Sequence, residues 1–210
     1  MEIDKKIDRI VFTLLSPDEI KKMAFVKVVT PELYDKEGYP VDGGLMDTRM
    51  GIIDPGLRCR TCGEKLKECS GHFGYIELAR PIIHVKYIRV ILNLLKSTCR
   101  SCGRILLDEK EVLKHKEYLD KLDKKSLIAR RKRTKFIINS LKNIRKCPHC
   151  NSKQYNIKID KPSTFIENDK RLSPLDIKNR LEKISNLDVE LLGLNPEIAR
   201  PEYTLLTMLP

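Results

Sequence analysis

Apolar residues recur three and four positions apart between 85 and 95, at Val85, Ile88, Ile91, Leu92 and Leu95. This spacing places them on one face of an α-helix, and we expect that face to pack in the core. The charged stretch between Cys102 and Cys147 is interpreted as two antiparallel helices, around 109–120 and 124–143.

Three further helices are predicted from turn and capping signals. Ser16 is followed by a proline and two acids, the order favoured at a helix start, and predicts a helix over 17–25. Ser173 repeats this pattern and predicts a helix over 174–184. A shorter helix is expected at 189–192, just before a glycine.

Strand-prone segments are short and scattered. We expect strands at 26–30, near 75–78 and at 155–159, and the apolar end of the chain at 204–209 is also strand-prone. An apolar chain end is typical of a cut chain or of a segment that packs on another polypeptide. The Gly-, Pro- and Asp-rich stretch 31–57 is interpreted as an extended loop. The predicted fold class is therefore α+β, with several irregular layers.

Composition excludes some classes of protein. The 210 residues are 41% hydrophobic and 33% charged, which is typical of one or two globular domains. The longest apolar runs fall well short of the ~18 residues that cross a bilayer. The N-terminus carries mixed charge without an apolar core, unlike a secretory signal. We therefore expect a cytoplasmic protein that does not contact a membrane.

The positive charge is concentrated in one segment. The formal net charge is +12, and residues 110–146 alone hold 14 basic and 4 acidic residues. A local basic block indicates a polyanionic partner, most often nucleic acid, although a solvated helical face would look the same. The candidate nucleic-acid contacts are Arg130, Arg131, Lys132, Arg133 and Lys135.

The seven cysteines are the most specific signal. Six form three Cys-x-x-Cys pairs, and the seventh, Cys69, precedes His72 by three positions. Seven thiols and one imidazole make two complete sets of four ligands, as two closed structural zinc sites require. A disulfide scheme would leave one thiol over.

We assign the zinc ligands in two sets. The first is Cys59, Cys62, Cys69 and His72; the second is Cys99, Cys102, Cys147 and Cys150, whose halves stand 44 residues apart. A redox pair explains three such motifs poorly, and a catalytic zinc would keep an open position. His149 is the alternative ligand in the second set, but its place inside a Cys-x-x-Cys turn predicts a solvent-facing ring.

The residue after each pair supports the metal interpretation. These residues are Gly63, Gly103 and Asn151, the types that most easily adopt positive φ after a metal-binding turn. A zinc held by four thiolates is formally anionic, so nearby cations could have a structural role instead of a nucleic-acid role. These cations are Lys96, Arg100, Arg104, Arg145 and Lys146.

Several segments together resemble one family, the largest subunit of the multisubunit DNA-directed RNA polymerases, and in particular the N-terminal part of its archaeal form. They are FTLLSPDEI at 12–20, GGLMD at 43–47, MGIIDPG at 50–56, CSGHFGYIELARP at 69–81 with His84, LGLNP at 192–196 and ARPE at 199–202. The resemblance spans nearly the whole chain and is most specific around the first cysteine set. The eukaryotic and bacterial forms resemble the chain more distantly.

The resemblance implies a place in the polymerase clamp, the lobe that closes over DNA. Residues 1–98 would form the clamp core with the first zinc, 99–150 a zinc-pinned helical insert called the clamp head, and 151–210 a return to the core. It implies contact with DNA, with the rest of the largest subunit, with the second-largest subunit and with other polymerase subunits. Contacts to the DNA backbone would be salt-sensitive and independent of sequence.

The family's catalytic loop, Asp-Phe-Asp-Gly-Asp, does not occur in these residues. The resemblance therefore implies that the catalytic Mg²⁺ is bound outside this chain and that the chain alone does not transfer nucleotides. We expect either a truncated or a split form of the family's protein. A free-standing zinc-dependent regulator and a zinc hydrolase are the competing hypotheses.

Overall fold

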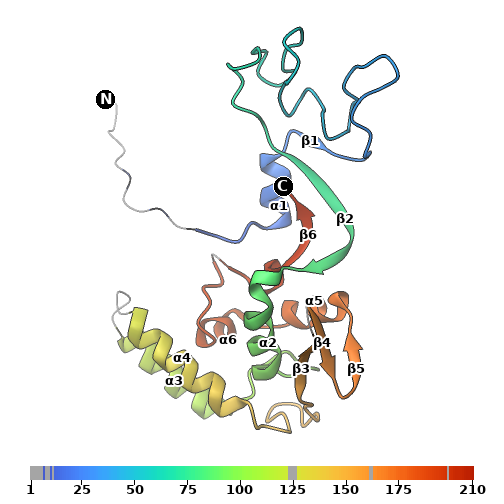
Figure 1. Ribbon diagram of the computed structural model, residues 1–210. Helices are drawn as coiled ribbons and strands as arrows, with labels where there is room; N and C mark the ends of the chain where they lie inside the picture. Colours follow the sequence, from blue (N-terminus) through green and yellow to red (C-terminus); the bar gives the residue numbers. More distant parts are fainter. Residues whose placement is uncertain (1–6, 8–9, 11, 123–126, 161–162, 198) are drawn as a thin grey trace. The chain divides into compact units, whose positions relative to one another are not determined.

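The computed structural model describes all residues except 1–6, 8–9, 11, 123–126, 161–162 and 198 (Figure 1). The backbone divides into two compact units. The N-terminal unit contains Leu15–Ile82 and the chain end Leu206–Pro210, and the C-terminal unit is built mainly from Ile83–Leu205. Both helices and small sheets are present, which confirms the predicted α+β class.

The N-terminal unit is organised by a three-stranded sheet of order β1-β2-β6. β1 (Val26–Lys27) pairs in parallel with β2 (Gly74–Ile83), and β6 (Leu205–Leu209) joins the other edge of β2. The helix α1 (Pro17–Met23) precedes β1 and begins at Ser16 in a complete capping box, as its sequence predicts. β1 is shorter than predicted, because the amides of the two residues after Val28 turn to the carbonyl of Gly43.

Between Lys27 and Gly74 the chain forms neither helix nor strand (Figure 1). The predicted extended loop is thus confirmed, and it is longer than expected. Buried apolar side chains are few in this unit: Ile20, Val26, Cys59 and Met208 among the described residues. Such a long irregular segment buries too little apolar surface to hold one conformation by packing alone. It therefore depends on hydrogen bonds and on cross-links such as disulfides or bound metal ions.

The C-terminal unit contains the main core and most of the regular elements. In chain order they are η1 (Val85–Tyr87), α2 (Ile88–Ser97), α3 (Glu109–Lys121), α4 (Leu127–Leu141), β3 (Ile157–Asp160), β4 (Thr164–Glu167), β5 (Lys170–Leu172), α5 (Pro174–Glu182), α6 (Asn186–Leu191) and η2 (Pro201–Thr204). The predicted helix at 85–95 begins only at Ile88. Before it, the His84 side chain accepts a hydrogen bond from the Lys86 amide and starts a 3₁₀ turn that leaves Val85 exposed.

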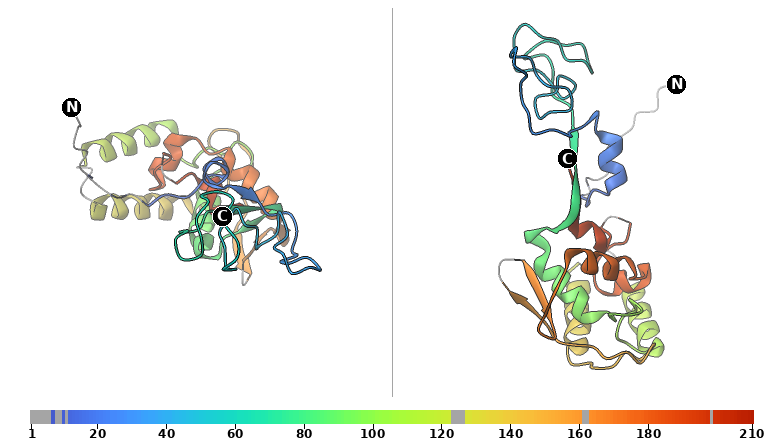
Figure 2. Two further views of the ribbon diagram at one scale, coloured as in Figure 1. Left: turned by 90° about the horizontal axis from the view of Figure 1, so that it is seen from above. Right: turned by 90° about the vertical axis from the view of Figure 1, so that its right-hand side faces the viewer.

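Helices α3 and α4 form the predicted antiparallel pair (Figures 1 and 2). Arg130 donates to the carbonyl of Leu119, and Arg133, one turn later in α4, donates to Nδ1 of His115, one turn earlier in α3. The turn between the two helices lies outside the described residues. Ile137 and Leu141 of α4 are fully buried, so this end of the pair joins the main core.

The second sheet, β3-β4-β5, is antiparallel throughout. The sequence pattern predicts only its first strand. β4 and β5 meet at Asn168 and Asp169, which both have positive φ, the geometry of a two-residue hairpin turn. Phe165 of β4 is fully buried in the same core as Ile91 of α2 and Ile177 of α5. Within the described residues, none of the helices has the length and apolar character to cross a bilayer.

Candidate metal centres

The three Cys-x-x-Cys turns share one backbone pattern. In each, the amide of the first cysteine donates to the carbonyl five residues later, and the amide four residues later donates back to that cysteine. In the first turn these bonds are Cys59 to Glu64 at 3.0 Å and Gly63 to Cys59 at 2.8 Å. The equivalents run from Cys99 to Arg104, Gly103 to Cys99, Cys147 to Ser152 and Asn151 to Cys147.

The residue that follows each pair has positive φ, as the sequence predicts: 76° at Gly63, 74° at Gly103 and 58° at Asn151. This conformation returns the chain across the turn and leaves both thiol groups on the same side. One local fold, used three times, therefore presents the six paired sulfur atoms.

The structure brings the first predicted set together. The ligand atoms of Cys59, Cys62, Cys69 and His72 all lie within 4.8 Å of one another. The Cys69 Sγ and the His72 Nε2 are 3.7 Å apart. A tetrahedral zinc with ordinary bond lengths would hold a sulfur and a nitrogen about 3.6 Å apart. The residues present therefore fit such an ion.

The second predicted set also converges, although its halves are far apart in sequence. All four sulfur atoms lie within 4.8 Å of one another. Cys99 and Cys150 are 3.5 Å apart, and Cys102 and Cys147 are 3.8 Å apart. A tetrahedral zinc would separate its sulfurs by about 3.8 Å, whereas a disulfide needs about 2.05 Å. The seven cysteines are all free thiols.

Each set contains a thiol that ionises easily. Burial raises the pKa of Cys59, but donated hydrogen bonds from the Cys62 and Thr61 amides outweigh it and lower the pKa to about 7. Burial also opposes ionisation of Cys99, yet the Ser152 hydroxyl and nearby amides lower its pKa to about 6. Burial raises the pKa of Cys102 to about 12. Because the thiolate is the metal ligand, the lowered pKa of Cys59 and of Cys99 favours coordination in each set.

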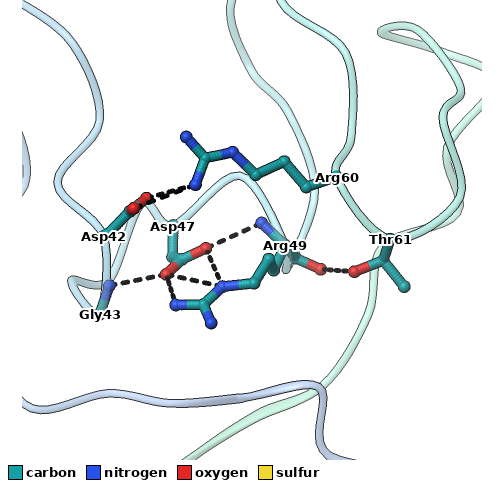
Figure 3. Close-up of polar contacts among 6 residues, drawn as sticks. All are labelled: Asp42, Gly43, Asp47, Arg49, Arg60 and Thr61. Atoms are coloured by element: carbon teal, nitrogen blue, oxygen red, sulfur yellow. Dashed lines mark hydrogen bonds and ion pairs between the residues drawn. The ribbon is translucent and has the colours of Figure 1, made fainter.

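A buried carboxylate supports the first set (Figure 3). Asp47 is 1% exposed and accepts hydrogen bonds from the Gly43 amide at 2.6 Å and from the Arg49 guanidinium at 2.5 Å. Arg49 in turn accepts a bond at its carbonyl from the Thr61 hydroxyl, at 2.7 Å, inside the first Cys-x-x-Cys turn. The pKa of Asp47 is lowered, chiefly by the bonds from Arg49. Asp47 thus fixes the loop against which the turn is held.

Two backbone hydrogen bonds tie this loop to both parts of the first set, the Cys59–Cys62 turn and the Cys69–His72 segment. The His72 amide donates to the carbonyl of Met50 at 2.8 Å, and the Arg60 amide donates to the carbonyl of Thr48. The sequence pattern predicts only a loop in this region and gives Asp47 no role. The signal that could have found it is an acid between two glycines and an arginine, in the GGLMDTR stretch at 43–49.

Two polar residues that the cysteine pattern does not single out support the second set. The Ser152 hydroxyl lies 3.1 Å from both the Cys99 and the Cys150 sulfurs. The Gln154 amide nitrogen donates to Cys99 at 3.3 Å, and its oxygen accepts from the Arg100 amide. Donors aimed at sulfur stabilise the thiolates and orient them.

His149 differs from the expectation that it faces solvent. Its ring is half-buried, and Nε2 lies 3.2 Å from the carbonyl of Ile105, a bond in which the ring nitrogen is the donor. Ile105 is fully buried in the core, and the hydrogen bond from His149 satisfies its carbonyl oxygen. This contact directs His149 to the backbone and leaves the second set to the four cysteines.

The basic cluster of α4 is divided by the structure. Arg130 and Arg133 are half-buried and bond to α3, and Arg133 also lies over the ring of Tyr118, 4.5 Å from its centroid. Arg131, Lys132 and Lys135 are exposed. Two of the five predicted nucleic-acid contacts are therefore engaged within the helix pair, and three are available to a partner.

Comparison with known proteins gives a family match and several similar relatives. The family model described as RNA polymerase Rpb1, domain 1, matches residues 4–210. The chain is similar to proteins named DNA-directed RNA polymerase subunit Rpo1N. It is 49% identical to that of Methanothermobacter thermautotrophicus, over 98% of this chain and 23% of the relative. The identity is 48% with that of Methanocaldococcus jannaschii (100% and 16%) and 42% with that of Sulfolobus acidocaldarius (99% and 24%). The chain thus spans about a quarter or less of the length of these relatives.

Proposed function

The chain belongs to the RNA polymerase Rpb1 domain 1 family, the N-terminal part of the largest subunit of archaeal DNA-directed RNA polymerase, and we propose that it forms the clamp region that holds DNA in the cleft. In this proposal residues 1–98 and 151–210 contribute to the clamp core and 99–150 form the clamp head. The observation that carries it is the pair of closed four-ligand groups in a chain that matches this family over almost its full length.

Each group would hold one structural zinc ion. Four protein ligands complete a tetrahedral shell, so neither ion would keep a position for a substrate or an activated water. Zinc would supply cross-links where apolar burial is scarce. The first ion would close the loop between β1 and β2, and the second would join the two ends of the α3–α4 segment. Rigid loops allow a clamp to transmit movement to the bound nucleic acid.

The DNA contacts proposed for this region come from Arg131, Lys132 and Lys135, which are exposed on α4. Contacts from lysine and arginine to phosphates carry no sequence information, which suits an enzyme that transcribes every sequence. Arg130 and Arg133 would support this surface from beneath by fixing α4 to α3.

Catalysis of nucleotide transfer is proposed for the whole polymerase and not for this segment. The catalytic Mg²⁺ would be bound outside the 210 residues, and the partners would be the rest of the largest subunit, the second-largest subunit, other polymerase subunits and DNA. A cytoplasmic location follows from this assignment.

The test uses polymerase assembled with the full-length subunit. Replacing Arg131, Lys132 and Lys135 by glutamine should reduce the slope of log affinity against log salt by about one unit for each cation that binds a phosphate. Zinc content and subunit composition should stay unchanged. A slope equal to that of the unaltered polymerase would show that α4 does not hold DNA.

A further inference from the structure

A second basic surface lies beside the second cysteine group. A pocket of about 850 Å³ is lined by the end of α2, the segment after α4 and the residues after Cys150. Five basic side chains line it: Lys96, Lys142, Arg145, Lys146 and Lys153. Within the described residues its only acidic lining residue is Glu167.

Glu167 does not neutralise these cations. Its carboxylate is bound by the Arg180 guanidinium at 2.5 and 3.2 Å, and both side chains are largely buried. Within the parts of the chain that the structure describes, none of the five lining cations has an acidic partner within 4.0 Å. The pocket therefore carries an uncompensated positive charge.

The backbone brings two of these cations directly opposite each other. Lys146 and Lys153 pair in an isolated antiparallel bridge, so their side chains leave the same face of the turn. Like charges at directly opposed positions destabilise a pair of strands. Both lysines are exposed. A bound anion between them would turn this repulsion into two favourable contacts.

The thiolates of the second group do not account for this charge. In the described residues, the donors that reach the Cys99 sulfur include the Ser101 and Cys102 amides, the Ser152 hydroxyl and the Gln154 amide, and none of them belongs to a lining lysine or arginine. Across the same part of the chain, the hydrogen bonds to the cysteine sulfurs come from groups other than the lining lysines and arginine. Five cations also exceed the formal double negative charge of zinc bound by four thiolates. Compensation of an anionic zinc site therefore does not explain all of the positive charge that lines this pocket.

We infer that this pocket binds the phosphate backbone of a nucleic-acid strand, as a contact separate from the exposed cations of α4. The inference rests on the proposed function, which brings nucleic acid to this part of the chain. Tyr155 lies on the pocket wall and is 40% exposed, with the Arg100 guanidinium 5.0 Å from its ring centroid. An exposed aromatic ring among cations is the arrangement that accepts a stacked base next to bound phosphates.

An acidic protein segment fits the pocket less well. Protein partners are held mainly by several apolar or aromatic anchors in well-packed pockets, and among the described lining residues Tyr155 is the one exposed aromatic side chain. Of the apolar lining residues, Leu95 and Leu106 are only 5% and 3% exposed because they belong to the core, and Ile144 is half-buried against it. The surface that a partner would meet consists largely of flexible cations and the amides of Asn143 and Asn156.

The test compares two double variants in polymerase assembled with the full-length subunit. The pocket variant carries Lys146→Gln and Lys153→Gln. The control carries Lys158→Gln and Lys170→Gln, which remove the same charge from exposed positions on β3 and β5 outside the pocket. The measured quantity is the salt dependence of polymerase dissociation from a DNA–RNA scaffold.

We expect the pocket variant to lower the salt slope by about two units, and the control to leave it unchanged. A photo-crosslinking residue at Tyr155 should label the DNA or the RNA. Without nucleic acid, the pocket variant should not lose zinc, because it relieves repulsion at the bridge.

The alternatives give different results. An unchanged slope in the pocket variant, together with a reduced slope in the α4 variant, overturns this inference and leaves the proposed function standing. Unchanged slopes in both variants overturn both. Crosslinking from position 155 to a protein alone, or zinc loss from the pocket variant, assigns the lysines to a docking or a structural role and overturns the inference.

Discussion

Gly103 lies against the backbone of Lys183. A Cβ atom built at Gly103 would be 2.6 Å from the Lys183 carbonyl oxygen, closer than real Cβ contacts allow. Gly103 ends the second Cys-x-x-Cys turn, and Lys183 caps the C-terminus of α5. Because Gly103 has no side chain, the second Cys-x-x-Cys turn can pack directly against the C-terminal end of α5.

This contact predicts unequal effects for two equivalent glycines. Gly63 and Gly103 have nearly the same φ, 76° and 74°, but a Cβ at Gly63 would meet nothing within 4 Å. Gly63→Ala should cost about 1 kcal/mol from backbone strain alone. Gly103→Ala adds a clash with backbone that cannot turn away, so its cost should be larger by about 1–3 kcal/mol. Thermal unfolding and zinc retention of the variant subunits measure the difference.

Asparagine provides the matched control. Asn151 occupies the equivalent position in the third turn with φ of 58°, so Gly63→Asn should be tolerated better than Gly63→Ala. Gly103→Asn should remain clearly more harmful than Gly63→Asn, because the clash with the Lys183 backbone remains. Equal destabilisation at the two glycines would mean that Lys183 moves aside and that the close approach has no energetic weight.

The predicted ligand sets lead to a metal count. Cys62→Ser and Cys102→Ser should each remove one zinc from the polymerase, and the double variant should remove two, because each set closes around its own ion. Atomic absorption of the assembled enzyme measures this relative to the unaltered enzyme. Loss of both ions from either single variant would contradict two independent sites.

The same variants should loosen different regions. In a small module with little apolar core, the free energy of zinc binding supplies much of the free energy of folding. Cys62→Ser should therefore raise amide exchange between β1 and β2, where only a few apolar side chains are buried. Cys102→Ser should affect the ends of α3 and α4 more than the buried helix α2. Uniform exchange changes in both variants would show that the two units unfold together.

Asp47 predicts an acid-sensitive loop. Its folded pKa is lowered, first by the bonds from Arg49, so the stabilisation is fully present above the ordinary aspartate pKa of about 4 and is lost as the pH falls toward the folded value. Asp47→Asn removes the charge at all pH values and should cost about 1–3 kcal/mol, because it weakens the charge-assisted hydrogen bonds from Arg49, whose side chain is 40% exposed and can be solvated. The exposed pair of Arg60 and Asp42 is the control, and Asp42→Asn should cost less than about 1 kcal/mol.

Hydrogen exchange at Thr61 and neighbouring amides, followed from pH 7 to pH 3, measures this effect. After correction for the intrinsic pH dependence of exchange, the protection of these amides in the unaltered chain should begin to fall below pH 4, and in Asp47→Asn it should already be low at neutral pH. An Asp47→Asn chain that exchanges normally at pH 7 would contradict the bracing role.

The sequence predicted local features better than long-range ones. The helix caps at Ser16 and Ser173 and the positive φ of Gly63 are decided within a few residues, so the pattern was sufficient. The β4–β5 hairpin was missed because its turn uses Asn168 and Asp169 instead of glycine. The two groups that converge in space are those into which counting donors in fours divides the cysteines and His72, because such counting does not depend on sequence distance.

Other features depend on tertiary partners that no local pattern contains. The sequence pattern predicts Arg133 as a nucleic-acid contact, yet its position depends on His115 and Tyr118 of another helix. Asp47 is buried because its carboxylate accepts hydrogen bonds from Gly43 and Arg49, in a loop that bonds to Thr61 of the first Cys-x-x-Cys turn. Lys146 and Lys153 face each other only because a bridge forms after the last Cys-x-x-Cys turn.

Glu167 and Arg180 form another ion pair whose removal should be costly. They are buried to 8% and 17% side-chain exposure and join β4 to α5 by two hydrogen bonds. Arg180→Gln would leave the carboxylate without its counter-ion and should destabilise the C-terminal unit by about 3–5 kcal/mol. Because Glu167 also lines the basic pocket, the released carboxylate would oppose phosphate binding there. Arg180→Gln should therefore weaken nucleic-acid retention as well as lower the unfolding temperature, whereas Glu167→Gln combined with Arg180→Gln should restore retention. If nucleic-acid retention stays low in the double variant, the loss of retention in Arg180→Gln comes from destabilised folding and not from the charge of Glu167.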